Sequence, residues 1–323
     1  MKRRLFSLAL PGALAMPAQT SKAAAPPPSR FSDNPDLSRF NPLPRIYFYD
    51  DFDNGINGWA ELEANHNGNL DTLRPVLRDM RPPQLSSCSF FDIGTHGSLN
   101  GTYALKLATR PKPYSTAVGI KRLTYSKPGL VQFEMYFTYK AEQTFRDAPF
   151  DGNASPSELD FGDFTISNDI SASEQGPRYH CALRYLNTSP DGRLAQKWMF
   201  KTSLHTTTKM ELAGAKAQTQ DYHVQNVDDW KDVPGGHQPL CFNEVATKIN
   251  WHYLRWRFDT AAHRNVELQV NELTMDLRQV PVPVYQQQYH ALNHLLNLVV
   301  DVRTHKAVRN FLFIDSIVLS MDV

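Results

Sequence analysis

The segment GLVQFEMYFT, residues 129–138, shows the pattern that decides the fold class. Successive side chains of a β-strand point to opposite faces, and in this segment apolar and polar residues alternate. Residues 254–258 and 266–270 repeat the alternation, and residues 311–321 form an apolar closing segment. Turn residues such as Pro128-Gly129 and Pro234-Gly235-Gly236 separate these runs. The sequence therefore predicts an all-β, antiparallel sandwich.

One segment shows a helical period instead. Tyr285, Tyr289, Leu292, Leu296 and Val299 would share one face of a helix that follows Pro281-Val282-Pro283. We expect this minor helix to pack against the outside of a sheet.

The N-terminal residues have the features of an export signal. Residues 1–25 begin with Lys2-Arg3-Arg4, continue with a short apolar stretch and end in small residues. This order predicts a signal peptide cleaved after Ala15 or between Ala23 and Ala25, and a periplasmic or secreted protein. The paired arginines leave both an ordinary and a twin-arginine export route open.

The remaining chain divides into two parts. Residues 26–44 are rich in Pro, Ser, Asn and Asp and predict an extended linker, and residues 45–323 predict one folded domain. No later segment reaches the length of a membrane span. The sequence therefore predicts no integral membrane segment once the signal is removed.

Charge and cysteine content exclude some functions. The chain has 34 basic and 33 acidic residues, so no long-range field attracts a polyanion. This balance argues against a nucleic-acid partner but leaves a local basic cleft open. Three cysteines, Cys88, Cys181 and Cys241, allow at most one bridge, and no CxxC or HExxH pattern indicates zinc.

Three segments resemble, in order, the concanavalin A-like lectin and glucanase superfamily. They are YDDFDNG at residues 49–55 with Trp59 just after, NWHYLRWRFD at residues 250–259 followed by residues 266–271, and FLFIDSIVL at residues 311–319. The resemblance frames most of the mature chain and leaves its middle poorly covered. It implies a jelly roll that binds a polysaccharide or oligosaccharide across one sheet.

The sequence ELDFGD, residues 158–163, resembles the carboxylate motif of glycoside hydrolase family 16. The resemblance implies Glu158 as nucleophile, Asp160 as assisting residue and Asp163 as acid on one bulged strand, with Gly162 as the residue at the bulge. A retaining glycosidase needs one ionised and one protonated carboxyl group close together. The final residue is Asp where the family has Glu, and its shorter arm would leave the acid out of reach unless the backbone moved closer. An acidic strand edge or solvated turn explains the same residues without catalysis.

A second constellation is cationic. His180 and Arg184 would share a sheet face with Lys197 and Lys201 of the next strand. Together with a nearby tyrosine, this face would suit β-elimination of a uronic-acid polymer, in which a cation neutralises the carboxylate and His or Tyr moves a proton. The alternative is an exposed face decorated with basic residues.

Aromatic residues support a binding function without catalysis. Trp198 and Trp251 are candidates to stack on sugar rings, and Tyr136 lies on the polar face of the first strand above. Trp256 alternates with Leu254 and Phe258 and is expected in the core.

The resemblance also implies a structural calcium ion between the first and last strands, for which Asp51, Asp53 and Asp315 are the matching acids. Calcium needs six or more oxygen ligands, so main-chain carbonyls or water would complete the site. Asp residues that cap turns are the alternative.

These observations predict an exported carbohydrate-active jelly roll. The favoured function is a glycoside hydrolase that uses a carboxylate pair. A non-catalytic glycan-binding protein and a polysaccharide lyase are the alternatives.

Overall fold

The computed structural model describes residues 35–60, 80–86, 98–142, 158–173, 176–202, 230–243, 249–285 and 293–322. Residues 35–39 form a 3-10 helix, η1 (Pro35–Arg39), and residues 40–323 form a separate compact unit. The predicted signal peptide lies outside the described residues. In the described ranges, no helix has both the length and the apolar character that crossing a membrane requires.

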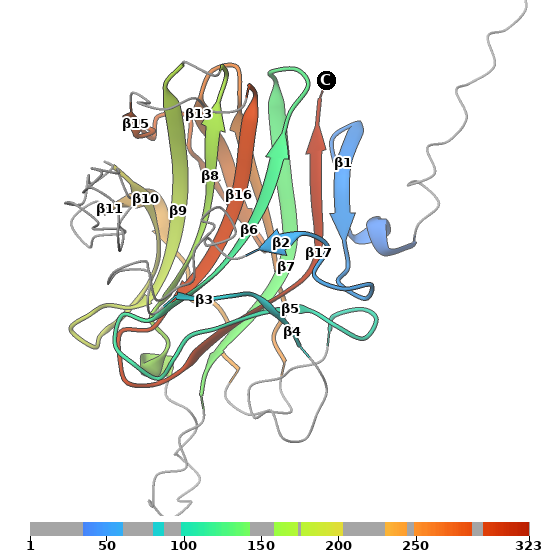
Figure 1. Ribbon diagram of the computed structural model, residues 1–323. Coiled ribbons are helices and arrows are strands. Elements are labelled where there is room, and N and C mark those ends of the chain that lie inside the picture. The colour runs from blue at the N-terminus through green and yellow to red at the C-terminus, as the bar shows by residue number, and fades with distance from the viewer. Residues whose placement is uncertain are drawn as a thin grey trace, which may run out of the picture. The chain divides into compact units, whose positions relative to one another are not determined.

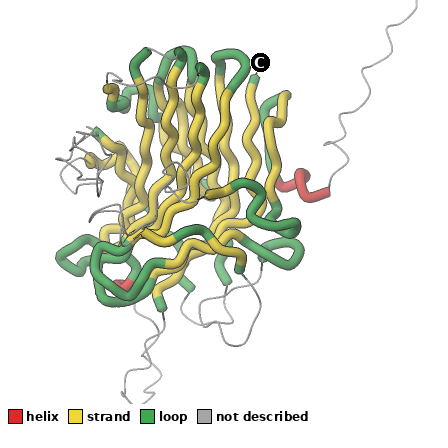
Figure 2. The backbone as a smooth tube through the Cα atoms, viewed as in Figure 1, coloured by secondary structure: helices red, strands yellow, loops and turns green. Residues whose placement is uncertain are grey.

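Two large sheets make up the unit of residues 40–323 (Figure 1). Strands dominate it throughout (Figure 2). The eight-stranded sheet has the order β14 (Leu273–Asp276), β13 (Arg264–Val270), β12 (His252–Asp259), β7 (Leu130–Ala141), β17 (Asn310–Met321), β5 (Leu105–Ala108) and β4 (Gln84–Leu85), with β1 (Arg45–Asp50) paired to β17.

The nine-stranded sheet has the order β11 (Trp230–His237), β10 (Leu194–Lys201), β9 (Arg178–Thr188), β8 (Asp163–Ser171), β16 (Leu295–Arg303), β6 (Thr116–Thr124) and β2 (Trp59–Ala60). Two short strands complete it, because β15 (Val284–Tyr285) pairs with β9 and β3 (Met80–Arg81) pairs with β6. Among the described strand pairs, only β3 and β6 run parallel. A short 3-10 helix, η4 (Glu158–Asp160), precedes β8.

The core lies between the two sheets and follows the alternation in the sequence. From β7, Phe133, Met135 and Phe137 point into it, and Trp256 of β12 is 1% exposed. Burying one such side chain contributes about 1.5–3 kcal/mol relative to leaving it in water. The predicted all-β sandwich is therefore confirmed, as is the core position of Trp256.

The predicted helix over residues 285–299 is wrong where the structure describes it. Leu296 and Val299 belong to β16, which pairs with β6 on one side and β8 on the other. Leu296, Leu298, Val300 and Val302 alternate with less apolar residues, and this period of two places them in the core. The hydrogen bonds of two neighbouring strands favour this pattern over the helical one. Tyr289 and Leu292 lie outside the described residues.

The first and last strands are neighbours. In the register of β1 and β17, Asp50 lies opposite Ile317 and Arg45 opposite Met321. Residues 40–44, which the sequence assigns to the linker, also contact the eight-stranded sheet: Asn41 N donates to Glu134 Oε1 at 2.9 Å, and Leu43 N donates to Ser320 Oγ at 2.9 Å. The two sheets form the two layers of the β-sandwich that the sequence predicts.

Candidate functional site

The nine-stranded sheet has one face toward the core and one face of mainly polar side chains. Phe164, Ile166, Leu183 and Tyr185 point into the core, so the residues that alternate with them point the other way. We call this second set the polar face. It includes Thr116, Val118, Ile120 and Arg122 of β6; Asn297, Val299, Asp301 and Arg303 of β16; Asp163, Thr165, Ser167, Asp169 and Ser171 of β8; Arg178, His180, Ala182, Arg184 and Leu186 of β9; Lys197, Met199 and Lys201 of β10; and Trp230 and Asp232 of β11. Four of these residues, Ala182, Leu186, Met199 and Trp230, form a buried apolar cluster.

Strand pairing arranges the polar face in rows that cross the strands. Directly opposed residues of antiparallel strands lie side by side on the same face. The first row is Arg122, Asn297, Asp169 and His180. The middle row is Ile120, Val299, Ser167 and Ala182, and the third contains Asp301, Thr165 and Arg184. Two rows with charged side chains therefore flank a row of apolar and small ones.

At one end of the polar face, Asp163 lies in a buried charged cluster with His305, Arg184 and Arg303. The Nε2 atom of His305 lies 2.6 Å from Oδ2 of Asp163, which is fully buried. Burial alone would raise the pKa of Asp163, but the His305 hydrogen bond and the two guanidinium groups outweigh it and hold this pKa below its ordinary value. Asp163 is therefore ionised at neutral pH and acts as the counter-ion of the cluster.

Arg184 links this cluster to β11. Its guanidinium carbon lies 4.4 Å from the centre of the Trp230 ring, and Nζ of Lys201 lies 5.4 Å from the same centre. Burial lowers the pKa of Arg184, and the Asp163 carboxylate opposes this effect. The predicted shared face of His180, Arg184, Lys197 and Lys201 is confirmed by the register of β9 and β10.

Buried polar atoms collect on this face. Oδ1 of Asp163, Nε of Arg184, Nδ1 of His305, Nε of Arg122 and Oδ1 of Asn297 have no hydrogen-bond partner in the described part of the chain. A buried polar atom without a partner costs about 1–3 kcal/mol. The face therefore carries hydrogen-bonding capacity that a polar ligand or water can satisfy.

Residues 158–163 do not form the bulged strand that the motif resemblance implied. Glu158 and Asp160 lie in η4, and only Asp163 belongs to β8. A turn forms here because neighbouring segments bind it: Asn187 Nδ2 donates to the carbonyl of Glu158 at 2.7 Å, and Asn310 Nδ2 donates to that of Asp160 at 2.9 Å. Glu158 and Asp160 therefore do not share a strand face.

The side chains of this turn also have protein partners. Gln196 Nε2 donates to Glu158 Oε1 at 2.7 Å, and Lys306 Nζ donates to Asp160 Oδ1 at 2.8 Å. Gly162 does not serve a bulge: a Cβ atom here would lie 2.6 Å from the carbonyl oxygen of Arg303. Glycine is required by the close approach of the chain after β16.

The aromatic residues that were predicted to contact sugar do not lie together. Trp198 points into the core, is fully buried and donates to Gln238 Oε1 at 3.0 Å, so the prediction that it stacks on sugar rings is wrong. Its position opposite Tyr185 in the register explains this, because both face inward. Trp251 precedes β12 and Tyr136 lies on β7, both in the eight-stranded sheet, and neither joins the polar face.

The acids expected to bind calcium hold the chain at residues 99–103 instead. Oδ1 of Asp53 accepts from the N–H groups of Thr102 and Tyr103, and Oδ2 of Asp315 accepts from those of Leu99 and Asn100, all at 2.6–2.9 Å.

Asp51 is engaged locally, since its Oδ1 accepts from Asp53 N at 3.2 Å. Main-chain donors thus engage one oxygen of each carboxylate. Within the described ranges no group of three His, Cys, Asp or Glu side chains could hold a metal ion. Calcium binding by these acids stays a prediction.

Burial raises the pKa of Asp315 to about 6, although the N–H groups of Asn100 and Leu99 lower it. Cys181 is buried and Cys241 exposed, both as free thiols, and Cys88 lies outside the described residues.

Sequence analysis missed several residues of the polar face. Asn297, Asp301 and Arg303 alternate with the core residues of β16, so a period of two in residues 295–303 could have revealed them. His305 lies after β16, and 142 positions separate it from Asp163. No local pattern indicates that pairing.

The family described as "Domain of unknown function (DUF6772)" matches residues 29–323. No curated protein matches the chain significantly.

Solved structures with a similar fold include peanut lectin, with 12% identity, a TM-score of 0.35 and coverage of 73% of this chain and 95% of that one. A β-1,3-glucanase from Mycobacterium marinum has 9% identity, a TM-score of 0.34 and coverage of 85% and 98%. A legume lectin-like domain from Entamoeba histolytica has 7% identity, a TM-score of 0.33 and coverage of 76% and 91%. Likeness at this level concerns the fold alone.

Proposed function

Because the chain belongs to the family described as "Domain of unknown function (DUF6772)", we propose its function from the geometry of the site: the polar face binds a polysaccharide that carries carboxylate groups. The observation that supports this is the arrangement of rows on the nine-stranded sheet. A chain of sugar rings laid across the strands would place its rings over the middle row and its polar groups against the rows beside it.

The middle row suits the apolar faces of sugar rings. Val299 is half-buried and offers an aliphatic group, whereas Ile120, Ser167 and Ala182 in the same row are almost fully buried, so a ring would contact this row mainly at Val299. Carbohydrate sites combine such apolar surface with a few placed polar groups that fix orientation. Asn297, half-buried in the first row, supplies an amide that can donate and accept hydrogen bonds.

The charge of the face favours an acidic sugar. Two of its ion pairs are internal, Arg178 with Asp169 and Lys197 with Asp232. Arg122 is half-buried, and burial lowers its pKa, which shows that its guanidinium is partly desolvated. A partly desolvated guanidinium binds a carboxylate more strongly than one in water and can do so through two parallel hydrogen bonds.

Elimination is a second candidate, favoured by the pairing of Asp163 with His305. An ionised carboxylate orients an imidazole and stabilises its charged form, as a general base requires. In this step His305 would remove the proton next to the sugar carboxylate, a C=C bond would form, and the glycosidic C–O bond would break with its electron pair moving to the leaving oxygen, which would take a proton from water. Arg184 and Arg303 would stabilise the charge that develops on the carboxylate.

Hydrolysis by Glu158 and Asp163 has less support. A retaining pair needs one protonated carboxyl group, whereas the lowered pKa of Asp163 leaves it without a proton to donate at neutral pH. Glu158→Gln tests whether Glu158 is the nucleophile of a hydrolase. If Glu158 is the nucleophile, this variant loses turnover of a responsive polysaccharide and keeps its binding.

The experiment compares binding of polygalacturonate and of a neutral glucan to the full chain by calorimetry at fixed ionic strength. We expect polygalacturonate to bind and Arg122→Gln to weaken it roughly tenfold, the loss typical of one charge-assisted hydrogen bond. Arg193→Gln is the matched control, because Arg193 lies between β9 and β10, is highly exposed and pairs with Asp191.

Equal binding by Arg122→Gln and wild type, or no binding of either polymer, would refute the proposal. Unsaturated products that absorb in the ultraviolet would identify elimination, and new reducing ends without them would identify hydrolysis.

A further inference from the structure

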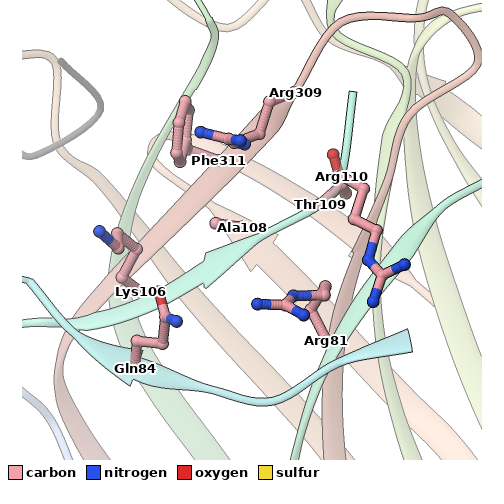
Figure 3. Close-up of a pocket in the computed structure, with 8 residues that line it drawn as sticks. All are labelled: Arg81, Gln84, Lys106, Ala108, Thr109, Arg110, Arg309 and Phe311. Atoms are coloured by element: carbon pink, nitrogen blue, oxygen red, sulfur yellow. The ribbon is translucent and has the colours of Figure 1, made fainter. Parts of the chain in front are cut away.

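A second site lies where the chain passes from β3 of the nine-stranded sheet to β4 of the eight-stranded sheet. A cavity of about 410 Å³ opens there, lined by Arg81, Gln84, Lys106, Ala108, Thr109, Arg110, Arg309 and Phe311 (Figure 3). We propose that this cavity binds a sulfate or phosphate group, as the free ion or as an ester on a sugar. The inference does not depend on the proposed function, because the cavity shares no residue with the polar face.

The lining is strongly cationic. It contains three arginines and one lysine and no acidic side chain. Glu142, in the described part of the chain, lies near the lining, since its Oε1 is 3.3 Å from Nη1 of Arg309. The chain as a whole has almost equal numbers of basic and acidic residues, so this concentration of one sign is local.

Pairing of short strands produces this concentration. Arg81 is brought in by β3, which pairs with β6 of the nine-stranded sheet. Lys106 lies opposite Gln84 in the pairing of β4 with β5, and Ala108 lies opposite Phe311 in the pairing of β5 with β17. The cavity is therefore built where segments of both sheets meet, on hydrogen-bonded strands.

The side chains point around a common space. Figure 3 shows Arg81 and Arg110 close together, Lys106 and Gln84 on the far side of Ala108, and Arg309 beside Phe311. A bound anion with two charges is attracted by a cavity at which four cationic side chains gather. Planar guanidinium groups donate parallel hydrogen bonds to the oxygens of a sulfate or phosphate group.

The volume of the cavity and its uncharged lining residues would also accommodate a ligand larger than a free ion. Pockets of about 300–1,000 Å³ accommodate small organic ligands. Ala108 and the Phe311 ring offer an apolar surface, and Gln84 offers an amide. A sugar that carries a sulfate or phosphate ester would use both the cationic and the apolar lining.

The experiment measures binding of inorganic sulfate, inorganic phosphate, galactose 6-sulfate and glucose 6-phosphate to the full chain, by calorimetry at constant ionic strength. Glucuronate, with a single charge, is the comparison ligand. We expect the doubly charged probes to bind and Arg81→Gln to weaken them about tenfold. Tighter binding of the sugar esters than of the free ions would identify an ester as the ligand, and equal binding would identify the ion.

Arg278→Gln is the matched control, because Arg278 is exposed beyond β14 at the opposite end of the eight-stranded sheet and pairs with Asp276. Arg110→Gln repeats the test from a second, exposed side chain, so misfolding of one variant does not decide the outcome. No binding by the wild type, or binding that both cavity variants retain in full, would overturn the proposal. Loss of polygalacturonate binding in Arg122→Gln with sulfate binding intact would separate the two sites.

Discussion

Replacing Asp163 with Asn tests the electrostatics of the buried cluster directly. The side chain keeps its shape and loses its charge, so the buried Arg184 loses one of the two carboxylates, Asp163 and Asp301, that act on it. Removing one partner of a buried ion pair costs about 3–5 kcal/mol. Because the amide still fills the space, we expect the lower value, about 3 kcal/mol. In a domain of this size that loss corresponds to a melting temperature lower by about 6–12 °C.

The assay is urea unfolding of wild type and Asp163→Asn, with Asp232→Asn as the matched control. Asp232 lies on the same sheet face and pairs with Lys197 at 2.8 Å, but its side chain is 58% exposed. An exposed pair of this kind contributes about 0–1 kcal/mol. The control should therefore unfold almost like the wild type.

The pH dependence gives a second test of the same prediction. The pKa of Asp163 is lower in the folded chain than the value of about 3.9 in an unfolded one, so its contribution is present above that value. As the pH falls through the folded pKa, the contribution disappears, and wild type and variant should converge. A variant within about 0.5 kcal/mol of wild type at neutral pH would show that Asp163 is not the ionised centre of the cluster.

Three further outcomes follow from single residues. Burial raises the pKa of Asp315 to about 6, so its ionisation destabilises the folded chain by about 3 kcal/mol as the pH rises from about 4 to above 6. Urea unfolding of the wild type should show the free energy of unfolding falling over this pH range, and Asp315→Asn should not show this fall. Gly162→Ala should lower the free energy of unfolding by about 1–3 kcal/mol, because the new methyl group meets the carbonyl oxygen of Arg303, and a melting temperature equal to wild type would contradict it. We also predict that the full chain is exported and loses its N-terminal residues. Changing Arg3 and Arg4 together to Lys should block export only if the twin-arginine route is used. An intact first residue on exported protein would exclude the signal peptide.

The core could be predicted from the sequence because alternation is a local property. In residues 129–138 and 254–258, each apolar residue lies two positions from the next, and the structure buries them. The same rule applied to residues 295–303 would have identified β16, but a helical period matched Leu296 and Val299 as well. Short apolar runs fit both periods, and pairing with two neighbouring strands decides between them.

The site was only partly predictable, because its charges are assembled by contacts between distant segments. His180 and Arg184 lie on the polar face as their spacing predicts, whereas the partner of Asp163 comes from the chain after β16. Alternation also does not predict how deeply a side chain is buried. It places Asp163 on the face opposite the core, but the residues that bury Asp163 and keep it ionised are not its neighbours in the sequence.

The contacts between distant segments explain why Glu158, Asp160 and Asp163 differ from the family motif that they resemble. A resemblance over six residues assigns roles by order, whereas the protonation state of each acid depends on burial and on charges brought by other strands. Asp163 is held ionised by a histidine and two arginines, and Asp315 is pushed toward protonation by burial. The partners of Asp163 thus oppose the role of proton donor that the motif resemblance implied. Proton transfer on this face would then use another group, and His305, whose Nε2 lies 2.6 Å from Oδ2 of Asp163, is a candidate.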